Sequence, residues 1–334
     1  MTKFFDDPAS RLHELIASVQ PKFRARFLEV VASIKDSFTL KGIEDLISLG
    51  RIDEALVTAE VAALRLSNTF GQVFQLSGQA AADFIGNKLQ LIVNFDQVNV
   101  SALDAMTRNQ LRLVREFVAE QRLATREALL DGIQRGINPR EMAIQVRQSI
   151  GLTQYQQQIV NNYRRNLETL DARALGRALR DKRFDRTVLN AIANDRSLTK
   201  DQIDKMVERY SQKWLRYRSE VIARTESLRS VHEGTDNMYH QAVQNGTLDS
   251  GDMVRTWDTS GDARVRDPAH TKMQGQQRGL DEPFVSGAGN QIMRPGDTDA
   301  PASETVQCRC AITTRFSDRA KQQVLSSKPQ LINT

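Results

Sequence analysis

Cysteine, proline, aromatic residues and long apolar runs are all scarce in this chain of 334 residues, and each scarcity excludes a class of protein. Two cysteines cannot build a disulfide framework, which indicates either a reducing compartment or a chain indifferent to redox conditions. No uncharged run approaches the roughly 18 residues of a membrane span, and the N-terminal residues lack the basic and apolar segments of a secretory signal. A mean hydropathy of −0.46 then predicts a soluble, globular chain of roughly two domains.

The residues that break helices are concentrated toward the C-terminus. Three of the 8 prolines lie before residue 230, whereas half of the 18 glycines lie after it. This contrast predicts a mainly α fold, in which a long helical N-terminal region is followed by a small α+β module with short antiparallel strands. The expected segments are a helical region at 1–199, a connecting helix at 200–245, the α+β module at 246–316 and a tail at 317–334.

Capping and breaking residues set the expected helix boundaries. Gly136 and the Asn138-Pro139 pair, for example, end one helix and begin the next. In chain order, the expected helices cover 10–19 and 22–37 on either side of Pro21, about Asp53 to Asn87, 101–135 with Ser101 as N-cap, 139 to about 151, 154–170 with Thr153 as N-cap, and shorter segments to about 195.

The last long helix carries an arginine in an apolar face. Thr199 and Gln202 form a capping box that opens this helix, and Asn245-Gly246 closes it. Arg224 stands where an apolar residue is expected, so its guanidinium requires a partner, with Glu220 or Glu226 as candidates. It either clamps carbonyls of the following segment or binds an anion. The face consists of Trp214, Tyr217, Val221, Arg224, Leu228 and Val231, at spacings of 3, 4, 3, 4 and 3, and is expected to be buried.

Short elements are expected in the glycine-rich end. Residues 254–257 have the composition of a strand, and 258–262 form a turn. Asp267-Pro268 opens a short helix that carries His270 and stops at Gly275. Alternation over 306–312 predicts a second strand, which turns Val306, Cys308, Cys310 and Ile312 to the core and Arg309 away from it.

His270, Cys308 and Cys310 are candidate zinc ligands, with His232 or Asp267 as candidates for a further ligand. Zinc accepts imidazole and thiolate together, and a strand Cys-x-Cys presents both sulfurs on one side. The cysteine spacing is shorter than the usual zinc spacing, and the chain has no second cysteine pair. The alternative is that both thiols pack as small apolar residues.

The sequence gives little support to an enzymatic function. A nucleobase deaminase needs His-x-Glu and Cys-x-x-Cys, whereas His232-Glu233 is adjacent here and the cysteines are one residue apart. Cys308 or Cys310 with His270 could form a nucleophile pair, but two buried thiols near a loop-anchoring histidine are the favoured alternative. A nucleotide site at residues 224–226 with His270 lacks a glycine-rich phosphate loop. The sequence therefore predicts a protein that is not an enzyme.

The positive charge forms a central block. Residues 108–229 contain 25 Lys and Arg and 15 Asp and Glu, a net charge of +10, while both flanking regions are slightly acidic. Such a block is a candidate surface for the phosphate backbone of double-stranded DNA. The alternative is a set of solvated helix faces with mixed charge.

An ordered set of motif residues resembles the phage Mu protein F-like family. The set spans about residues 205–316 and leaves the helical residues 1–200 outside it. Pro295-Gly296-Asp297 continues the family order, but Thr298 follows where the family tends to carry proline. The matching residues are Arg224, Thr225, Glu226, Trp257, Asp258, Arg264, Arg266, His270, Gly275, Phe284, Cys308 and Cys310.

The resemblance implies a minor internal head protein of a tailed bacteriophage, acting in head morphogenesis at or near the portal. It implies the portal protein and other head proteins as partners, and a location inside the virion head after assembly in the bacterial host cytoplasm. The alternative implied by the same family is a virion protein that binds packaged double-stranded DNA and is ejected into the host with the genome.

Overall fold

The computed structural model describes residues 8–37, 39–51, 68–83, 95–96 and 100–317. These residues form two compact units that are each assembled from separate stretches of the chain. The first unit draws on Met1–Arg24, Asn68–Gln110 and Val221–Thr334, and the second on Ala25–Ser67 and Leu111–Glu220. These two units are groups of residues in contact and do not test the expected division into four consecutive segments, which stays a prediction.

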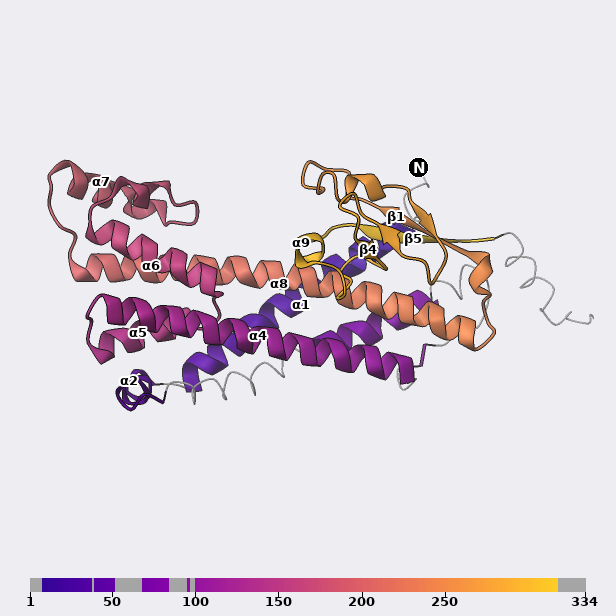
Figure 1. Cartoon of the computed structure of the whole chain (residues 1–334), viewed down its shortest axis with the longest axis horizontal. Helices are drawn as coiled ribbons and strands as arrows, with labels where there is room; N and C mark the ends of the chain where they lie inside the picture. The colour runs from indigo at the N-terminus through magenta and orange to yellow at the C-terminus, as the bar shows by residue number, and fades with distance from the viewer. Residues whose placement is uncertain (1–7, 38, 52–67, 84–94, 97–99, 318–334) are drawn as a thin grey trace, which may run out of the picture. The chain divides into compact units, whose positions relative to one another are not determined.

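The helices occupy most of the described chain (Figure 1). A helical stretch over residues 68–83 lies between α2 and α4. None of the helices in these described ranges combines the length and the apolar character needed to cross a bilayer. The helices are α1 (Pro8–Ser37), α2 (Leu40–Ser48), α4 (Val100–Gln134), α5 (Pro139–Ser149), α6 (Gln154–Glu168), α7 (Asp185–Ala193), α8 (Lys200–Gln244) and α9 (Ala302–Thr305), with 3-10 turns η1 (Ala172–Gly176), η2 (Lys182–Phe184), η3 (Ser250–Asp252) and η4 (Thr271–Met273).

Two small antiparallel sheets follow α8 in the first unit. One has the strand order β2-β1-β5, and the other pairs β3 with β4. In the longest pairing, Trp257 lies opposite Ile312 and Arg255 opposite Thr314. The expected mainly α fold with a small α+β module is thereby confirmed. The strands are β1 (Met253–Asp258), β2 (Gln277–Arg278), β3 (Phe284–Val285), β4 (Gln291–Ile292) and β5 (Ala311–Phe316).

Helix caps lie where the sequence predicts them. The Asn138 side chain accepts a hydrogen bond of 2.9 Å from the Glu141 N–H, with Pro139 in the first turn of α5. Thr153 forms a reciprocal capping box at the start of α6. The Thr199 hydroxyl accepts from the N–H of Gln202, whose side chain accepts from the N–H of Thr199.

Three boundaries differ from expectation. Helix α1 continues through Pro21, which lies on its exposed side. Its apolar face is buried on both sides of this proline, so packing outweighs the loss of one backbone hydrogen bond. Ser101 lies inside α4 rather than at its N-cap. Of the stretch expected from Asp53 to Asn87, 68–83 is helical, and the remainder lies outside the described residues.

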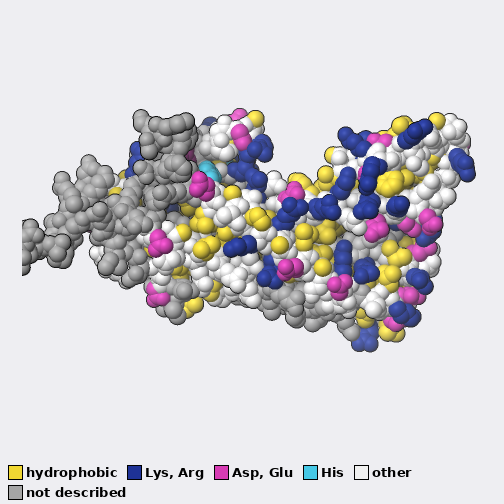
Figure 2. Space-filling model, turned by 180° about the vertical axis from the view of Figure 1, so that it is seen from behind, with side chains coloured by type: hydrophobic (Ala, Val, Ile, Leu, Met, Phe, Trp, Pro, Cys, Tyr) yellow, Lys and Arg dark blue, Asp and Glu magenta, His cyan; other side chains and the backbone are white. Residues whose placement is uncertain are grey.

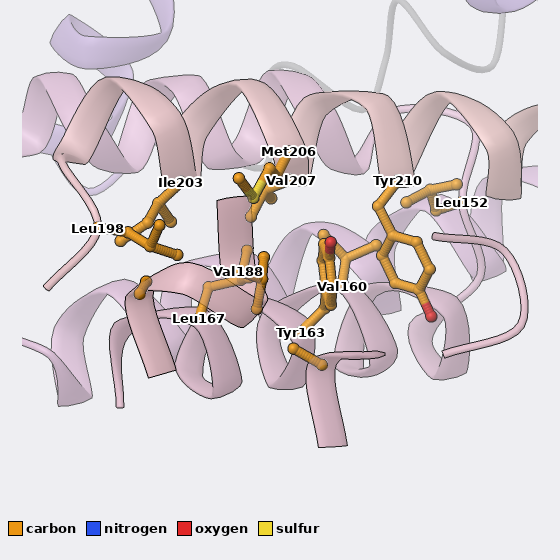
Figure 3. Close-up of a cluster of buried hydrophobic side chains, with 12 residues drawn as sticks. Leu152, Val160, Tyr163, Leu167, Val188, Leu198, Ile203, Met206, Val207 and Tyr210 are labelled. Carbon is orange, nitrogen blue, oxygen red and sulfur yellow. The ribbon is translucent and has the colours of Figure 1, made fainter. Parts of the chain in front are cut away.

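The second unit has a core shared by α6, α7 and the first part of α8. Figure 3 shows apolar side chains of α8 pointing toward α6 and α7. The rings of Tyr163 and Tyr210 have centroids 4.4 Å apart. The burial of the Tyr163 hydroxyl raises its pKa to about 12. The fully or largely buried members are Leu152, Val160, Tyr163, Leu167, Ala174, Val188, Ala191, Leu198, Ile203, Met206, Val207 and Tyr210.

Truncating Leu167 tests this core. Its side chain is fully buried, so we expect Leu167→Ala to lower the free energy of unfolding by about 2–5 kcal/mol through lost burial and a residual cavity. Leu189 of α7 is 53% exposed and provides the control, for which Leu189→Ala should cost less than about 0.5 kcal/mol. Urea unfolding followed by circular dichroism measures both, and equal costs would contradict the assigned core.

Candidate functional site

Strand β1 places the central residues of the site. Alternate side chains of this strand turn inward, so Met253, Arg255 and Trp257 are buried. Trp257 is completely covered, and its ring packs against the rings of His270 and Phe284 at centroid distances of 5.9 and 5.2 Å. The aromatic contacts fix the imidazole beside the sheet.

His270 lies between two buried cysteines and the tryptophan. Its Nδ1 is 3.4 Å from Cys310 Sγ and 3.8 Å from Cys308 Sγ. The Cys310 N–H donates to Cys308 Sγ at 3.4 Å. The three side chains are 2 to 3% exposed, and their potential ligand atoms all lie within 4.8 Å of one another. We call this set the thiol–imidazole cluster.

The far side of the imidazole faces a carboxylate. His270 Nε2 lies 3.8 Å from Glu304 Oε2, and both residues are buried. The other carboxylate oxygen of Glu304 accepts from Ser286 Oγ at 3.0 Å and from Asn290 Nδ2 at 2.5 Å. These two hydrogen bonds anchor the carboxylate, while Nε2 and Oε2 have no hydrogen-bond partner among the described residues.

The environment separates the acidities of the two thiols. The hydrogen bond from Cys310, with a further contribution from His270, holds the pKa of Cys308 well below its usual value. Sharing that hydrogen bond, together with burial, raises the pKa of Cys310. The two thiols are therefore not equivalent, and Cys308 is the more acidic of the two.

The secondary structure around the cluster differs from the sequence prediction. Strand β5 begins at Ala311, not at residue 306, because α9 and a turn occupy the preceding residues. Gln307 has a φ of +58°, and this left-handed turn redirects the chain just before Cys308. His270 lies in turns before the 3-10 helix η4, not in an α-helix, although the segment stops at Gly275 with a φ of +75° as expected.

Arg255 holds two loops, through three of their carbonyls, from the buried face of β1. Its guanidinium donates to the carbonyls of Gly279 at 3.0 Å, Glu282 at 2.8 Å and Met293 at 3.1 Å. It also lies 3.4 Å from Asp236 Oδ1 and stacks over the Phe284 ring at 5.4 Å. With 1% exposure, this arginine satisfies loop carbonyls that have no strand partner.

The buried arginine of α8 in this unit is Arg229. It donates to the Gly296 carbonyl at 2.8 Å and pairs with Glu226 at 2.7 Å. Arg224 is only partly buried, and Tyr217 is 43% exposed, so the prediction of a fully buried face through Arg224 was wrong. The register of α8 turns Arg229 inward instead, and Glu226 pairs with that residue.

Other motif residues also fasten loops. The Thr225 hydroxyl accepts from the Gln307 N–H at 3.1 Å, beside the cysteine-bearing turn, and Arg266 donates to the Val306 carbonyl. Arg309 points away from the core and pairs with Asp262 at 2.6 Å. Arg264 pairs with the same carboxylate. These ion pairs hold the pKa of Asp262 well below its usual value.

Some expected members lie outside the cluster. Among the described residues, the group that could hold a metal comprises His270, Cys308 and Cys310, without His232 or Asp267. Burial lowers the pKa of His232 to about 3, so this imidazole stays neutral. Glu304 was missed from the sequence, because no fixed spacing relates it to His270.

Comparison with protein families identifies the family of this chain. The model of the family described as Phage Mu protein F like protein matches residues 124–313, more than half of the chain. The chain belongs to this family of head morphogenesis or minor capsid proteins, which is generally a structural, non-enzymatic family. No curated protein and no solved structure gave a significant match.

The match confirms the resemblance and corrects its extent. It begins at residue 124, within α4, and so includes α5, α6 and α7. The helical residues from 124 to 200 therefore belong to the family region, contrary to the boundary expected from the motifs. Their apolar pattern is less distinctive than glycine, tryptophan and cysteine motifs, which is why the motifs alone showed only the C-terminal part.

Substituting Arg255 tests the loop clamp. We expect Arg255→Met to lower the free energy of unfolding by about 3 kcal/mol or more, because three carbonyls and Asp236 lose a buried donor. Arg255→Lys should recover only part of the loss, since an ammonium cannot reproduce the planar fork. The control is Arg264→Met, because the Arg264 side chain is 74% exposed. This substitution should lower the free energy of unfolding by less than about 0.5 kcal/mol.

Thermal and urea unfolding of the three variants give these costs. A clamp predicts the order Arg255→Met, then Arg255→Lys, then Arg264→Met, from most to least destabilised. Equal free energies of unfolding for Arg255→Met and Arg264→Met would contradict the assignment of Arg255 as a loop clamp.

Proposed function

We propose that this chain is a minor internal head protein that acts in phage head morphogenesis at or near the portal. The observation that carries the proposal is the family match over residues 124–313, which includes residues from both compact units. The proposed partners are the portal protein and other head proteins, and the proposed location is the interior of the virion head.

The chemistry of the C-terminal module agrees with an assembly role. Its reactive side chains, His270 and the two cysteines, are at most 3% exposed and have little access to a substrate. Its arginines are engaged with loop carbonyls and carboxylates. A module fastened in this way suits an interaction surface that must keep its shape through assembly.

Location and copy number test the proposal. In purified procapsids and mature virions of the phage that encodes this chain, quantitative mass spectrometry should detect it at a few copies per portal ring. The portal protein is the internal reference and the major capsid protein the control for contamination. Cross-linking of procapsids should connect this chain to the portal.

The outcomes separate the alternatives. Presence in procapsids alone would make the chain an assembly factor that leaves before maturation. Cross-links confined to the major capsid protein would contradict the portal location. Absence from both particles would contradict the head role itself.

A second candidate function is binding of packaged double-stranded DNA, followed by ejection with the genome. The observation that favours it is the net charge of +10 in residues 108–229. Much of this charge is already paired in the second unit, as in Arg164 with Asp204 and Arg165 with Asp131. On the face shown in Figure 2, basic and acidic side chains are interspersed. Portal-associated assembly is therefore the first candidate.

Exposed arginines of α4 allow a direct test of DNA binding. Arg115, Arg122 and Arg126 are exposed and separated by 7 and 4 residues, which places them along one side of the helix. If they contact phosphates, each Arg→Gln substitution should reduce the slope of log K against log salt by about 1. Fluorescence anisotropy with a DNA duplex between about 50 and 200 mM salt measures this slope.

The control substitutes Arg264, which is exposed and lies outside the basic block. Arg264→Gln should leave the slope unchanged. If the unmodified chain binds duplex DNA weakly, with an affinity that does not change with salt concentration, the proposed DNA function is contradicted.

A further inference from the structure

We propose that the thiol–imidazole cluster is a zinc site, in which His270 Nδ1, Cys308 Sγ and Cys310 Sγ are the protein ligands. The proposal concerns the internal chemistry of the module and goes beyond its role in the phage head. It rests on the positions of the three ligand atoms and on what surrounds them.

The two separations from the imidazole match tetrahedral zinc, and the two sulfurs lie within 4.8 Å of each other. With Zn–N near 2.0–2.1 Å and Zn–S near 2.3 Å, tetrahedral angles place ligand atoms about 3.5 to 3.8 Å apart. The two separations from His270 Nδ1 to the sulfurs are 3.4 and 3.8 Å. An ion placed between the three atoms would thus reach all of them with small side-chain adjustments.

The charges also balance. Two thiolates and a neutral imidazole neutralise Zn²⁺, so the complete unit carries no net charge into an environment where the ligand side chains are 2 to 3% exposed. A soft set of two sulfurs and one imidazole is typical of zinc, and Ca²⁺ or Mg²⁺ would require oxygen ligands.

Glu304 supplies an independent observation. A zinc-bound histidine almost always donates its other ring N–H to a carboxylate, carbonyl or water, which fixes the tautomer. Here Nε2 faces Glu304 Oε2 at 3.8 Å, and neither buried atom has a hydrogen-bond partner among the described residues. Metal at Nδ1 would place the ring proton on Nε2, directed at this carboxylate. Packing of the thiols as small apolar groups gives no reason for Glu304 Oε2 to face His270 without a hydrogen bond.

The neighbouring rings complete the surroundings. Trp257 packs on His270, and Phe284 packs on Trp257, so an apolar wall shields one side of the site. A cysteine nucleophile would instead need access for its substrate. Three protein ligands leave a fourth position, which a water molecule would occupy. The bound ion would cross-link the turns that carry His270 and the cysteines.

Metal content is the first test. The full chain, produced with zinc in the medium and purified without chelator, should contain about one zinc ion per chain by inductively coupled plasma mass spectrometry. Cys308→Ser and Cys310→Ser should each reduce it at least tenfold. His240→Asn is the matched control, because His240 lies in the same unit but bonds to Asp236 and Asp281, and it should retain the zinc.

Cobalt provides a readout of the ligands themselves. Co²⁺ replacing zinc should give the near-ultraviolet charge-transfer absorption of thiolate ligation, which the His240→Asn variant keeps and each cysteine variant weakens. Glu304→Gln should still bind zinc but with an affinity about 10- to 100-fold lower, measured by competition with a chromophoric chelator.

These measurements can overturn the proposal even where a cysteine variant does not fold. Less than about 0.1 zinc per unmodified chain, together with no thiolate absorption on addition of Co²⁺, would refute the site. Zinc retained by a folded Cys308→Ser/Cys310→Ser double variant would also refute it. None of these results depends on particle location, so failure of the zinc site and failure of the head function are distinguishable.

Discussion

The C-terminal module depends on buried guanidinium groups that satisfy the carbonyls of its loops. Its longest strands have six residues, so most of its backbone has no strand partner to accept or donate hydrogen bonds. Unpaired buried carbonyls are costly, and a guanidinium can serve several at once because its five N–H donors lie in one plane. Arg255 serves three carbonyls in two loops, and Arg229 and Arg266 serve one loop each.

These clamps determine where the thiol–imidazole cluster can form. Arg255 and Trp257 turn to the same face of β1, so the strand that holds the loops also supports the imidazole. The cysteine-bearing turn is held from the other side, by the Thr225 hydroxyl at Gln307 and by Arg266 at Val306. The distances between imidazole and sulfurs therefore follow from hydrogen bonds made by residues outside the cluster.

Signals between neighbouring residues predicted much of this fold. They did not predict the contacts between residues that are far apart in the sequence. The caps at Asn138, Thr153 and Thr199 depend on neighbours three residues away, so the sequence contains the whole interaction. Pro21 is a local signal that the continuous burial of α1 overrides. The composition of residues 254–257 predicted the β1 strand.

The candidate site shows the same limit. Its three ligand residues could be named from their chemistry, and the structure brings them together. Which arginine of α8 bonds to the loop at Gly296 depends on helix register against a segment far along the chain, and periodicity alone favoured Arg224 over Arg229. Glu304 approaches His270 across 34 residues, a relation that spacing cannot show.

The motif residues of this family thus act mainly as fasteners. Glu226 pairs with Arg229, which joins α8 to the loop at Gly296. Arg309, between the two cysteines, joins the segment before β5 to the turn at Asp262, and Trp257 joins the sheet to His270. A signature composed of fasteners identifies a fold more readily than an activity. A zinc ion at His270 would belong to the same set, because it would join two further turns without requiring catalysis. The loops of the module would then be held by the ion as well as by the buried arginines.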